Sequence, residues 1–280
     1  MTNPGMKEPR AVAVGVGGSW IDDGAVDWAL SESVVSGAPI RVLHVVEHRA
    51  RPLNGPAAVS EAEQLVDDVR EYLDRHDTGA VHTGVILSGG PAHMLGRCTA
   101  GDRMLVVGRH SRGLVGQVLI GSTAEAVVSE PSTAVVVVPP TWSPGDPAAP
   151  IVVGVDELEH CETALDFAAA LAAERGAPIR MVQVCDTGEP AVEIESQELE
   201  AADRHCRERF PGVRFETELR RGRPVAELLD AAQAAGAQLL VVGGRSHRRL
   251  VAAVLGSTVR GILQHADCPV AIVHQPGADS

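Results

Sequence analysis

The chain has few aromatic residues, an excess of negative charge and no long apolar run. It contains three Trp, one Tyr and three Phe among 280 residues, so it lacks the stacking platforms of proteins that bind single-stranded nucleic acid. Its 37 acidic residues outnumber 24 basic residues, which gives a formal net charge of −13. Such a chain repels a nucleic-acid backbone, and its apolar runs are shorter than a membrane span requires. We therefore expect no nucleic-acid partner and no membrane insertion.

Several motifs of catalysis and metal binding are also absent from the sequence. It has no Gly-Lys-Ser/Thr, no Gly-x-Ser-x-Gly and no His-Glu-x-x-His, so we expect neither efficient catalysis nor a metal site. The five cysteines include no Cys-x-x-Cys pair, which argues against a disulfide framework and fits a reducing cytoplasm. An apolar stretch near the N-terminus leads directly into Asp22 and Asp23. We interpret that stretch as a strand rather than a signal peptide.

The chain does contain an internal repeat. Residues 106–123 (VVGRHSRGLVGQVLIGST) match residues 241–258 (VVGGRSHRRLVAAVLGST) in their Val-Val-Gly, in one serine and in their final Gly-Ser-Thr. The pentapeptide Gly-Ala-Pro-Ile-Arg occurs at 37–41 and again at 176–180. Duplication of a whole domain explains both matches. We predict domain one at 1–140, a proline-rich linker at 141–150 and domain two at 151–280.

Within each half, short apolar runs alternate with segments of helical periodicity. The runs at 11–16 and 151–156 are typical of strands that are buried on both faces. Later strands are expected at 81–87, 133–138, 213–219 and 269–274. Strands that alternate with helices predict an α/β fold, in which helices cover both faces of a parallel sheet.

The repeated stretch has the chemistry of an anion-binding loop. Gly108 and Gly243 end a strand and let backbone approach a ligand without an intervening Cβ. Basic residues follow, and then Gly-Ser-Thr before an apolar, helix-like segment. A helix that begins there presents free N–H groups and a positive dipole end to phosphate. The predicted contacts are Gly108, Gly121, Ser122, Thr123, Gly243, Gly256, Ser257 and Thr258.

Other residues near these loops have two interpretations each. Arg109, Arg112 and Arg245 either pair with phosphate through their guanidinium groups or are solvated loop charges. Gly15 and Gly154 either let a nucleoside approach the first strand or allow close helix packing. The sequence alone leaves both questions open.

Several short motifs occur in a characteristic order. They are VGVGGS at 14–19, LHV at 43–45, VGVD at 153–156, Gly-x-x-Ser-x9-Gly-Ser at 108–122 and 243–257, and CPVAIV at 268–273. In these residues the chain resembles the universal stress protein family in its tandem, two-domain form. The resemblance implies a doubly wound, five-stranded sheet of order 3-2-1-4-5 in each half. It also implies ATP, with Mg²⁺ as an optional companion, across the carboxyl ends of strands one and four, which agrees with the general rule for such sheets.

The resemblance assigns roles to single residues as well. Val45 and Val184 match a position that lines the adenine, and Asp156 matches an acidic residue near the nucleoside, where the first half has Gly17. The middle glycine of the family's loop is replaced by Ser111 and Ser246, and serine resists positive φ more than glycine does. The candidate ATP site comprises Gly15, Val45, Gly108, Arg109, Ser111, Gly113, Gly121, Ser122, Thr123, Gly154, Asp156, Val184, Gly243, Arg245, Ser246, Gly256, Ser257 and Thr258.

Two functional hypotheses follow. The first is a cytoplasmic stress-response regulator that holds ATP without efficient turnover, with slow hydrolysis at most, and that changes a surface offered to an unidentified protein partner. The second is an interaction module that binds no nucleotide. Its halves would form an internal pseudo-dimer through their fifth strands, because Val135–Val138 would otherwise be an exposed apolar edge. With either function we expect the chain to form a homodimer.

Overall fold

The computed structural model describes residues 10–47, 56–76, 79–109, 120–129, 133–185, 192–244 and 255–275. The first half contains β1 (Val12–Gly15), a short 3-10 helix (Trp20–Asp22), α1 (Ala25–Ser36), β2 (Ile40–Val46), α2 (Pro56–His76), β3 (Thr83–Ser88), α3 (Pro91–Cys98), β4 (Met104–Gly108), α4 (Ser122–Val128) and β5 (Val135–Val138). The second half contains β6 (Ile151–Val155), α5 (Leu158–Arg175), β7 (Ile179–Cys185), α6 (Val192–Arg209), β8 (Phe215–Arg221), α7 (Pro224–Ala235), β9 (Leu239–Gly243), α8 (Ser257–His265) and β10 (Val270–Val273).

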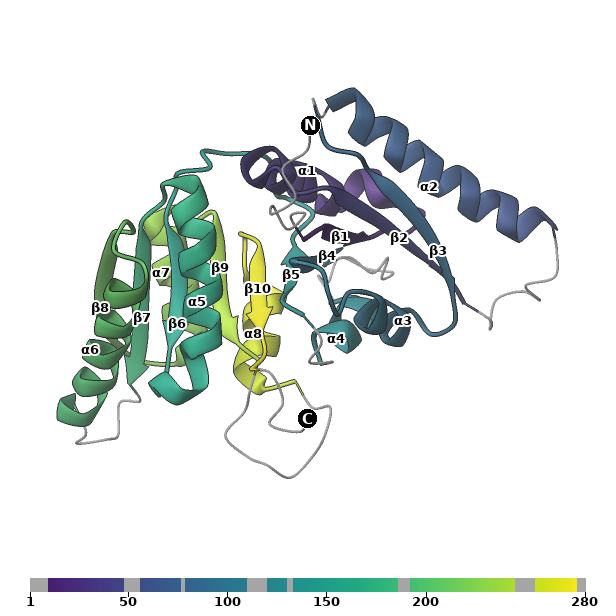
Figure 1. Ribbon diagram of the computed structural model, residues 1–280. Coiled ribbons are helices and arrows are strands. Elements are labelled where there is room, and N and C mark those ends of the chain that lie inside the picture. The colour runs from purple at the N-terminus through teal and green to yellow at the C-terminus, as the bar shows by residue number, and fades with distance from the viewer. Residues whose placement is uncertain are drawn as a thin grey trace.

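The ten strands form one sheet with the order β3-β2-β1-β4-β5-β10-β9-β6-β7-β8 (Figure 1). All strand pairs within a half are parallel. The predicted order 3-2-1-4-5 therefore occurs twice, and the predicted fold class is confirmed. The strand expected at 81–87 begins only at Thr83, because Val81 is exposed and the ring of His82 instead accepts the backbone N–H of Ile40.

The halves meet where β5 and β10 pair antiparallel. Val136 pairs with Ala271, its own counterpart in the repeat. An internal two-fold axis therefore passes between these two residues, and the expected pairing through the fifth strands is confirmed. Because the pairing is antiparallel, the carboxyl ends of the two sets of strands lie at opposite edges of the sheet.

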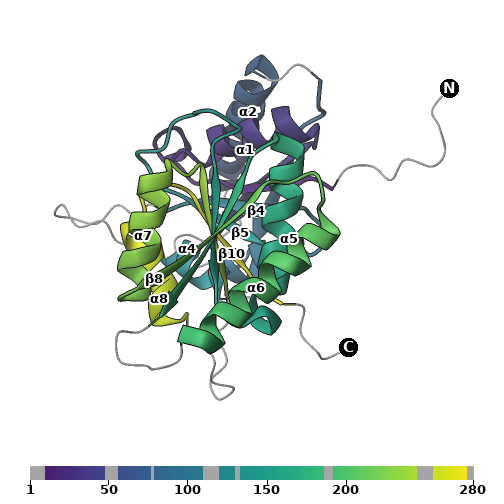
Figure 2. The same cartoon turned by 90° about the vertical axis from the view of Figure 1, so that its left-hand side faces the viewer.

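Helices cover both faces of the sheet. One layer consists of α1, α2, α5 and α6, and the other of α3, α4, α7 and α8. Figure 2 shows α5 and α6 on one side of the strands and α7 and α8 on the other. Each face has a hydrophobic core that contains residues of both halves, so the core continues across the line where the halves meet. Among the described helices, none is both long and apolar enough to cross a membrane.

The repeated Gly-Ala-Pro-Ile-Arg has the same structural role in both halves. Gly37 (φ 68°) ends α1, and Gly176 (φ 64°) ends α5. A glycine reaches this left-handed conformation without a steric penalty from Cβ. The repeat thus marks the turn from a helix into the second strand of each half.

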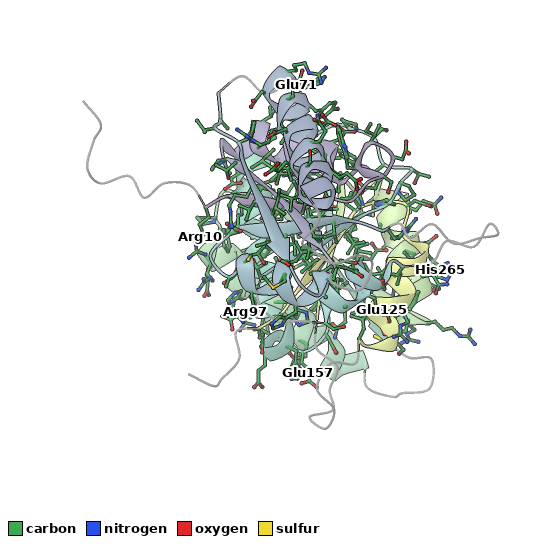
Figure 3. All side chains as sticks on the ribbon, turned by 90° about the vertical axis from the view of Figure 1, so that its right-hand side faces the viewer. Arg10, Glu71, Arg97, Glu125, Glu157 and His265 are labelled. Atoms are coloured by element: carbon green, nitrogen blue, oxygen red, sulfur yellow. The ribbon has the colours of Figure 1, made fainter. Side chains whose placement is uncertain are left out.

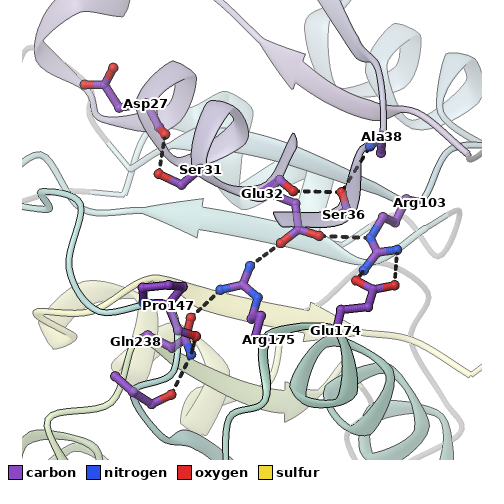
Figure 4. Close-up of polar contacts among 11 residues, drawn as sticks. Asp27, Ser31, Glu32, Ser36, Ala38, Arg103, Pro147, Glu174, Arg175 and Gln238 are labelled. Carbon is purple, nitrogen blue, oxygen red and sulfur yellow. Dashed lines mark hydrogen bonds and ion pairs between the residues drawn. The ribbon is translucent and has the colours of Figure 1, made fainter. Parts of the chain in front are cut away.

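A buried ionic network joins α1 to α5 across the interface between the halves (Figure 4). Glu32 is fully buried, with Arg103 Nε 3.0 Å from one carboxylate oxygen and Arg175 paired with the other. Arg103 also pairs with Glu174, and Arg175 donates to the side chain of Gln238. Burial lowers the pKa of Arg103, but the bond to Glu174 and the charges of Glu32 and Glu174 outweigh it and raise the pKa. The buried carboxylate of Glu32 therefore pairs with one arginine from each half, Arg103 and Arg175.

Candidate functional site

In the second half, β6 and β9 end side by side at a topological switch point. Strand β6 pairs with β7 on one side and with β9 on the other, and the chain leaves β6 and β9 toward opposite helix layers. Asp156 follows β6 and is exposed. Gly256 precedes α8, which has no side-chain cap, and Ser257 is exposed in its first turn. An open helix N-terminus beside a switch point is where doubly wound sheets bind ligands.

The first half repeats this arrangement at the opposite edge of the sheet. Strand β1 lies between β2 and β4. Gly121 precedes α4, which likewise has no side-chain cap, and Ser122 is exposed. The N–H of Gly121 donates to the carbonyl oxygen of Arg109 at 3.0 Å. This bond brings the end of the loop back to its beginning at Gly108.

Four predicted site residues lie outside the described residues. They are Ser111, Gly113, Arg245 and Ser246, and Arg112 lies there too. Their predicted contacts with phosphate therefore remain predictions.

Val45 and Val184 occupy equivalent places at the carboxyl ends of β2 and β7. Both are half-buried and pack against the core on the α3/α7 face. Each lies one strand away from the switch point of its half. Their predicted contact with adenine remains a prediction.

The surroundings of Gly15 and Gly154 favour one of their two interpretations. A Cβ on Gly15 would lie 3.2 Å from Val107 and 3.3 Å from Leu95 of α3. A Cβ on Gly154 would lie 3.3 Å from Leu228 of α7. These glycines make room for the helices that pack on the sheet, so close packing accounts for them.

Arg109 has a different role from the one predicted. Its side chain is buried, and Nη1 donates to the carbonyl oxygens of Leu263, at 3.3 Å, and Ala266. Both carbonyls belong to the end of α8, in the other half of the chain. Burial lowers the pKa of this guanidinium. The structure thus corrects the prediction that Arg109 pairs with phosphate, because its donors hold the opposite half.

Asp23 lies against the start of the first candidate loop, a position that sequence reasoning missed. A Cβ on Gly108 would come within 2.6 Å of the Asp23 Cβ and 2.8 Å of its Oδ2, so this side chain lies directly on the start of the first loop. Its Oδ1 accepts the N–H of Ala25 at 3.0 Å, and burial raises its pKa to about 6. Asp23 supplies an acidic group to the half whose strand-end position is Gly17. The signal that could have located it is an aspartate just before an apolar helix, where its side chain can cap the first turn.

Replacing Asp23 by asparagine should stabilise the protein at neutral pH. The folded pKa of about 6 lies above the ordinary aspartate pKa of 3.8, so the folded state binds this proton more tightly than the unfolded state. The resulting penalty is absent below pH 4, grows as the pH rises through the folded pKa, and is complete above it. Asparagine keeps the oxygen that accepts from Ala25, so the free energy of unfolding should rise by roughly 2 kcal/mol at pH 7.5 and by little at pH 4.

Urea unfolding of both proteins at the two pH values measures this difference. The matched control is Asp22→Asn, because Asp22 is an exposed neighbour, and a surface change of this kind should shift stability by less than about 0.5 kcal/mol. An Asp23→Asn gain that is equal at both pH values would contradict the assigned cause.

One other cluster in the described part of the chain has ligand-type side chains. Glu162, Asp166 and His205 place one ligand atom each within 4.8 Å of one another, between α5 and α6. His205 Nε2 lies 3.1 Å from Asp166, and Arg209 pairs with the other oxygen of Asp166 at 2.8 Å. The cluster thus already has a cationic partner in Arg209, and we interpret it as a link between the two helices.

The model of the universal stress protein family matches residues 9–139 and 148–274. A universal stress protein of Mycolicibacterium smegmatis is 29% identical over 94% of this chain and 96% of its own. One from Mycobacterium tuberculosis is 27% identical over 96% of this chain and 100% of its own.

Solved structures give the same result for the fold. The crystal structure of a universal stress protein from Archaeoglobus fulgidus superposes with a TM-score of 0.74, at 16% identity, over 95% of this chain and 98% of that one. A shorter universal stress protein from the same organism, solved in complex with dAMP, is 29% identical over 45% of this chain. That match covers 95% of the shorter chain, with a TM-score of 0.37.

Proposed function

The chain belongs to the universal stress protein family, and from that premise we propose that it is a regulatory protein that binds ATP at its two carboxyl edges. One observation carries the proposal. In both halves a helix begins with Gly-Ser-Thr beside the switch point of a doubly wound sheet, and no side chain of the described residues caps its first turn. An ordinary helix start does not require Gly-Ser-Thr, so its presence at equivalent positions of both halves favours a shared binding role.

In the second half, different residues are suited to bind the phosphates, the ribose and the adenine of ATP. The open N–H groups and exposed hydroxyl at Gly256–Thr258 are donors for phosphate oxygens. Exposed Asp156 can accept hydrogen bonds from ribose hydroxyls, and half-buried Val184 offers an apolar border to a purine. Mg²⁺ would enter with the triphosphate, since it is normally held partly by substrate phosphates.

We further propose that the nucleotide is held without efficient turnover, because the sequence has no Walker-type lysine and no motif of a known nucleophile. Bound nucleotide would then change the surface offered to a protein partner. A cytoplasmic location and a homodimer complete the proposal.

Mass spectrometry of the nucleotide released from freshly purified, denatured protein tests the proposal directly. We expect ATP, at one or two moles per chain. Absence of nucleotide, together with no calorimetric binding of added ATP and Mg²⁺, would contradict it and favour the alternative interaction module.

Replacing Gly256 by tryptophan should abolish stabilisation by ATP at the second site. At about 100 times its Kd, a ligand that binds only the folded state stabilises it by about 2.7 kcal/mol. A tryptophan at the start of α8 would fill the space in front of its N–H groups. Thermal unfolding with and without ATP measures the loss.

The matched control is Gly212→Trp, because Gly212 is an exposed turn residue with no heavy atom within 4 Å of an added Cβ. It should keep the full shift in Tm. Equal shifts in the wild type and in both variants would show that ATP does not bind at Gly256–Thr258.

A further inference from the structure

Helix α8 runs across the sheet from one candidate site to the edge that carries the other. It begins at Ser257, at the carboxyl edge of the second half, and is nine residues long, or about 13 Å. Since the halves are antiparallel, its C-terminal end lies at the carboxyl edge of the first half. One rigid element therefore reaches both edges.

Arg109 holds the far end of α8 and belongs to the frame of the first site. Its side chain donates to the carbonyls of Leu263 and Ala266. Its backbone N–H donates to Val138 at 2.8 Å, and its carbonyl accepts the N–H of Gly121 at 3.0 Å. The residue that closes the first loop thus also fixes the helix of the second site.

The second half makes the reciprocal contact with a different residue. His274 follows β10, and its Nε2 lies 2.7 Å from the carbonyl oxygen of Val128, the last residue of α4. Val128 and Leu263 are equivalent positions of the repeat. The counterpart of Arg109 is Gly244, where an added Cβ would lie 2.2 Å from the His274 ring. Gly244 therefore leaves the space in which the ring of His274 lies.

A third contact joins the two helices directly. Arg260 of α8 pairs with Glu125 of α4, and these two residues are also equivalent positions of the repeat. The helices that begin at the two sites are thereby linked to each other directly, in addition to the contacts of Arg109 and His274 with their C-terminal ends.

We propose that Arg109 and His274 are positioning residues that couple the nucleotide sites at Gly121–Thr123 and Gly256–Thr258. Arg109 is bonded to Gly121 and holds the end of α8, and His274 lies over Gly244 and contacts the end of α4. The coupling rests on the proposed function of these loops. A nucleotide bound at Gly121–Thr123 would hold the Gly121–Arg109 hydrogen bond and, through the Arg109 side chain, stabilise the end of α8. The second nucleotide then binds at a helix whose motion is already reduced, so it loses less conformational entropy.

Hydrogen exchange on the full chain tests the coupling first without nucleotide. The amide of Arg260 donates to the carbonyl of Gly256 at 3.0 Å and so reports the first turn of α8, at the far end from Arg109. In Arg109→Met we expect this amide to exchange roughly tenfold faster, because bonds from a charged donor to the helix end are lost. The matched control is Arg97→Met, since Arg97 lies on the surface away from this interface (Figure 3) and should leave the rate unchanged.

A faster rate that is confined to the last turn of α8, with the Arg260 amide unchanged, would overturn the proposal. If Arg109→Met does not fold, the reciprocal variant His274→Gln decides. Its reporter is the Glu125 amide, which donates to Gly121 at 2.9 Å, and an unchanged rate there would overturn the proposal equally.

Calorimetry with ATP and Mg²⁺ is the second test, and it measures the affinity of each site for ATP. In Arg109→Met, affinity at the second site should fall about fivefold or more, although Arg109 lies in the other half. Unchanged affinity would overturn the coupling. If ATP binds neither the wild type nor the variant, the proposed function fails, and the exchange rates without nucleotide still decide whether the helices are linked.

Discussion

Replacing Glu32 by alanine should destabilise the folded protein by about 3–5 kcal/mol, which is the usual cost of removing one partner from a buried ion pair. Glu32 is 0% exposed and its partner Arg175 is 7% exposed. Without the carboxylate, Arg175 keeps only the amide oxygen of Gln238 as an acceptor among the described side chains, and its charge stays out of water. Arg103 suffers less, because it retains Glu174.

Urea unfolding measures this effect, with the midpoint and the slope compared between proteins. The matched control is Glu174→Gln in the same network. Its side chain is 37% exposed, and a partly solvated pair contributes about 0–1 kcal/mol. Equal losses in the two variants would show that burial of Glu32 does not determine the strength of this network.

The sequence predicted most of the fold because its signals are local and occur twice. The repeated Gly-Ala-Pro-Ile-Arg marks the turn into the second strand in each half, and the apolar runs mark strands buried on both faces. The pairing of the halves followed from one physical argument, namely that Val135–Val138 would be an unprotected apolar edge. The strand order itself came from the family resemblance rather than from the pattern of residues.

The roles of single polar residues could not be predicted in the same way. Arg109 belongs to a basic stretch whose pattern is typical of a phosphate-binding loop. Its hydrogen-bond acceptors, however, are the carbonyl oxygens of Leu263 and Ala266, which are far away in the sequence. Glu32 lies in a helix, and no residue near it in the sequence predicts its ion pair with Arg175. Asp23 acquires its raised pKa from burial against Gly108, which only the packed structure shows. Each depends on tertiary neighbours that local spacing does not contain.

Replacing Val136 by aspartate should prevent stable folding of the whole chain. Val136 is 0% exposed, pairs with Val106 on one side and Ala271 on the other, and lies beside the internal two-fold axis. A carboxylate buried there would have no partner among its strand neighbours, and such substitutions cost more than about 4 kcal/mol. Circular dichroism and urea unfolding would show the loss, and Val81→Asp is the control because Val81 is 79% exposed.

The extent of that loss distinguishes two descriptions of the molecule. If the halves were independent domains, one substitution in β5 would damage the first half and leave β6 protected against hydrogen exchange. The hydrophobic core on the face of Val136, however, contains residues from both halves without interruption, and β10 would lose its partner on the same side. We therefore expect β1 and β6 to lose protection together, in a single transition. If β6 kept its protection against hydrogen exchange, the two halves would unfold separately even though their strands form one hydrogen-bonded sheet.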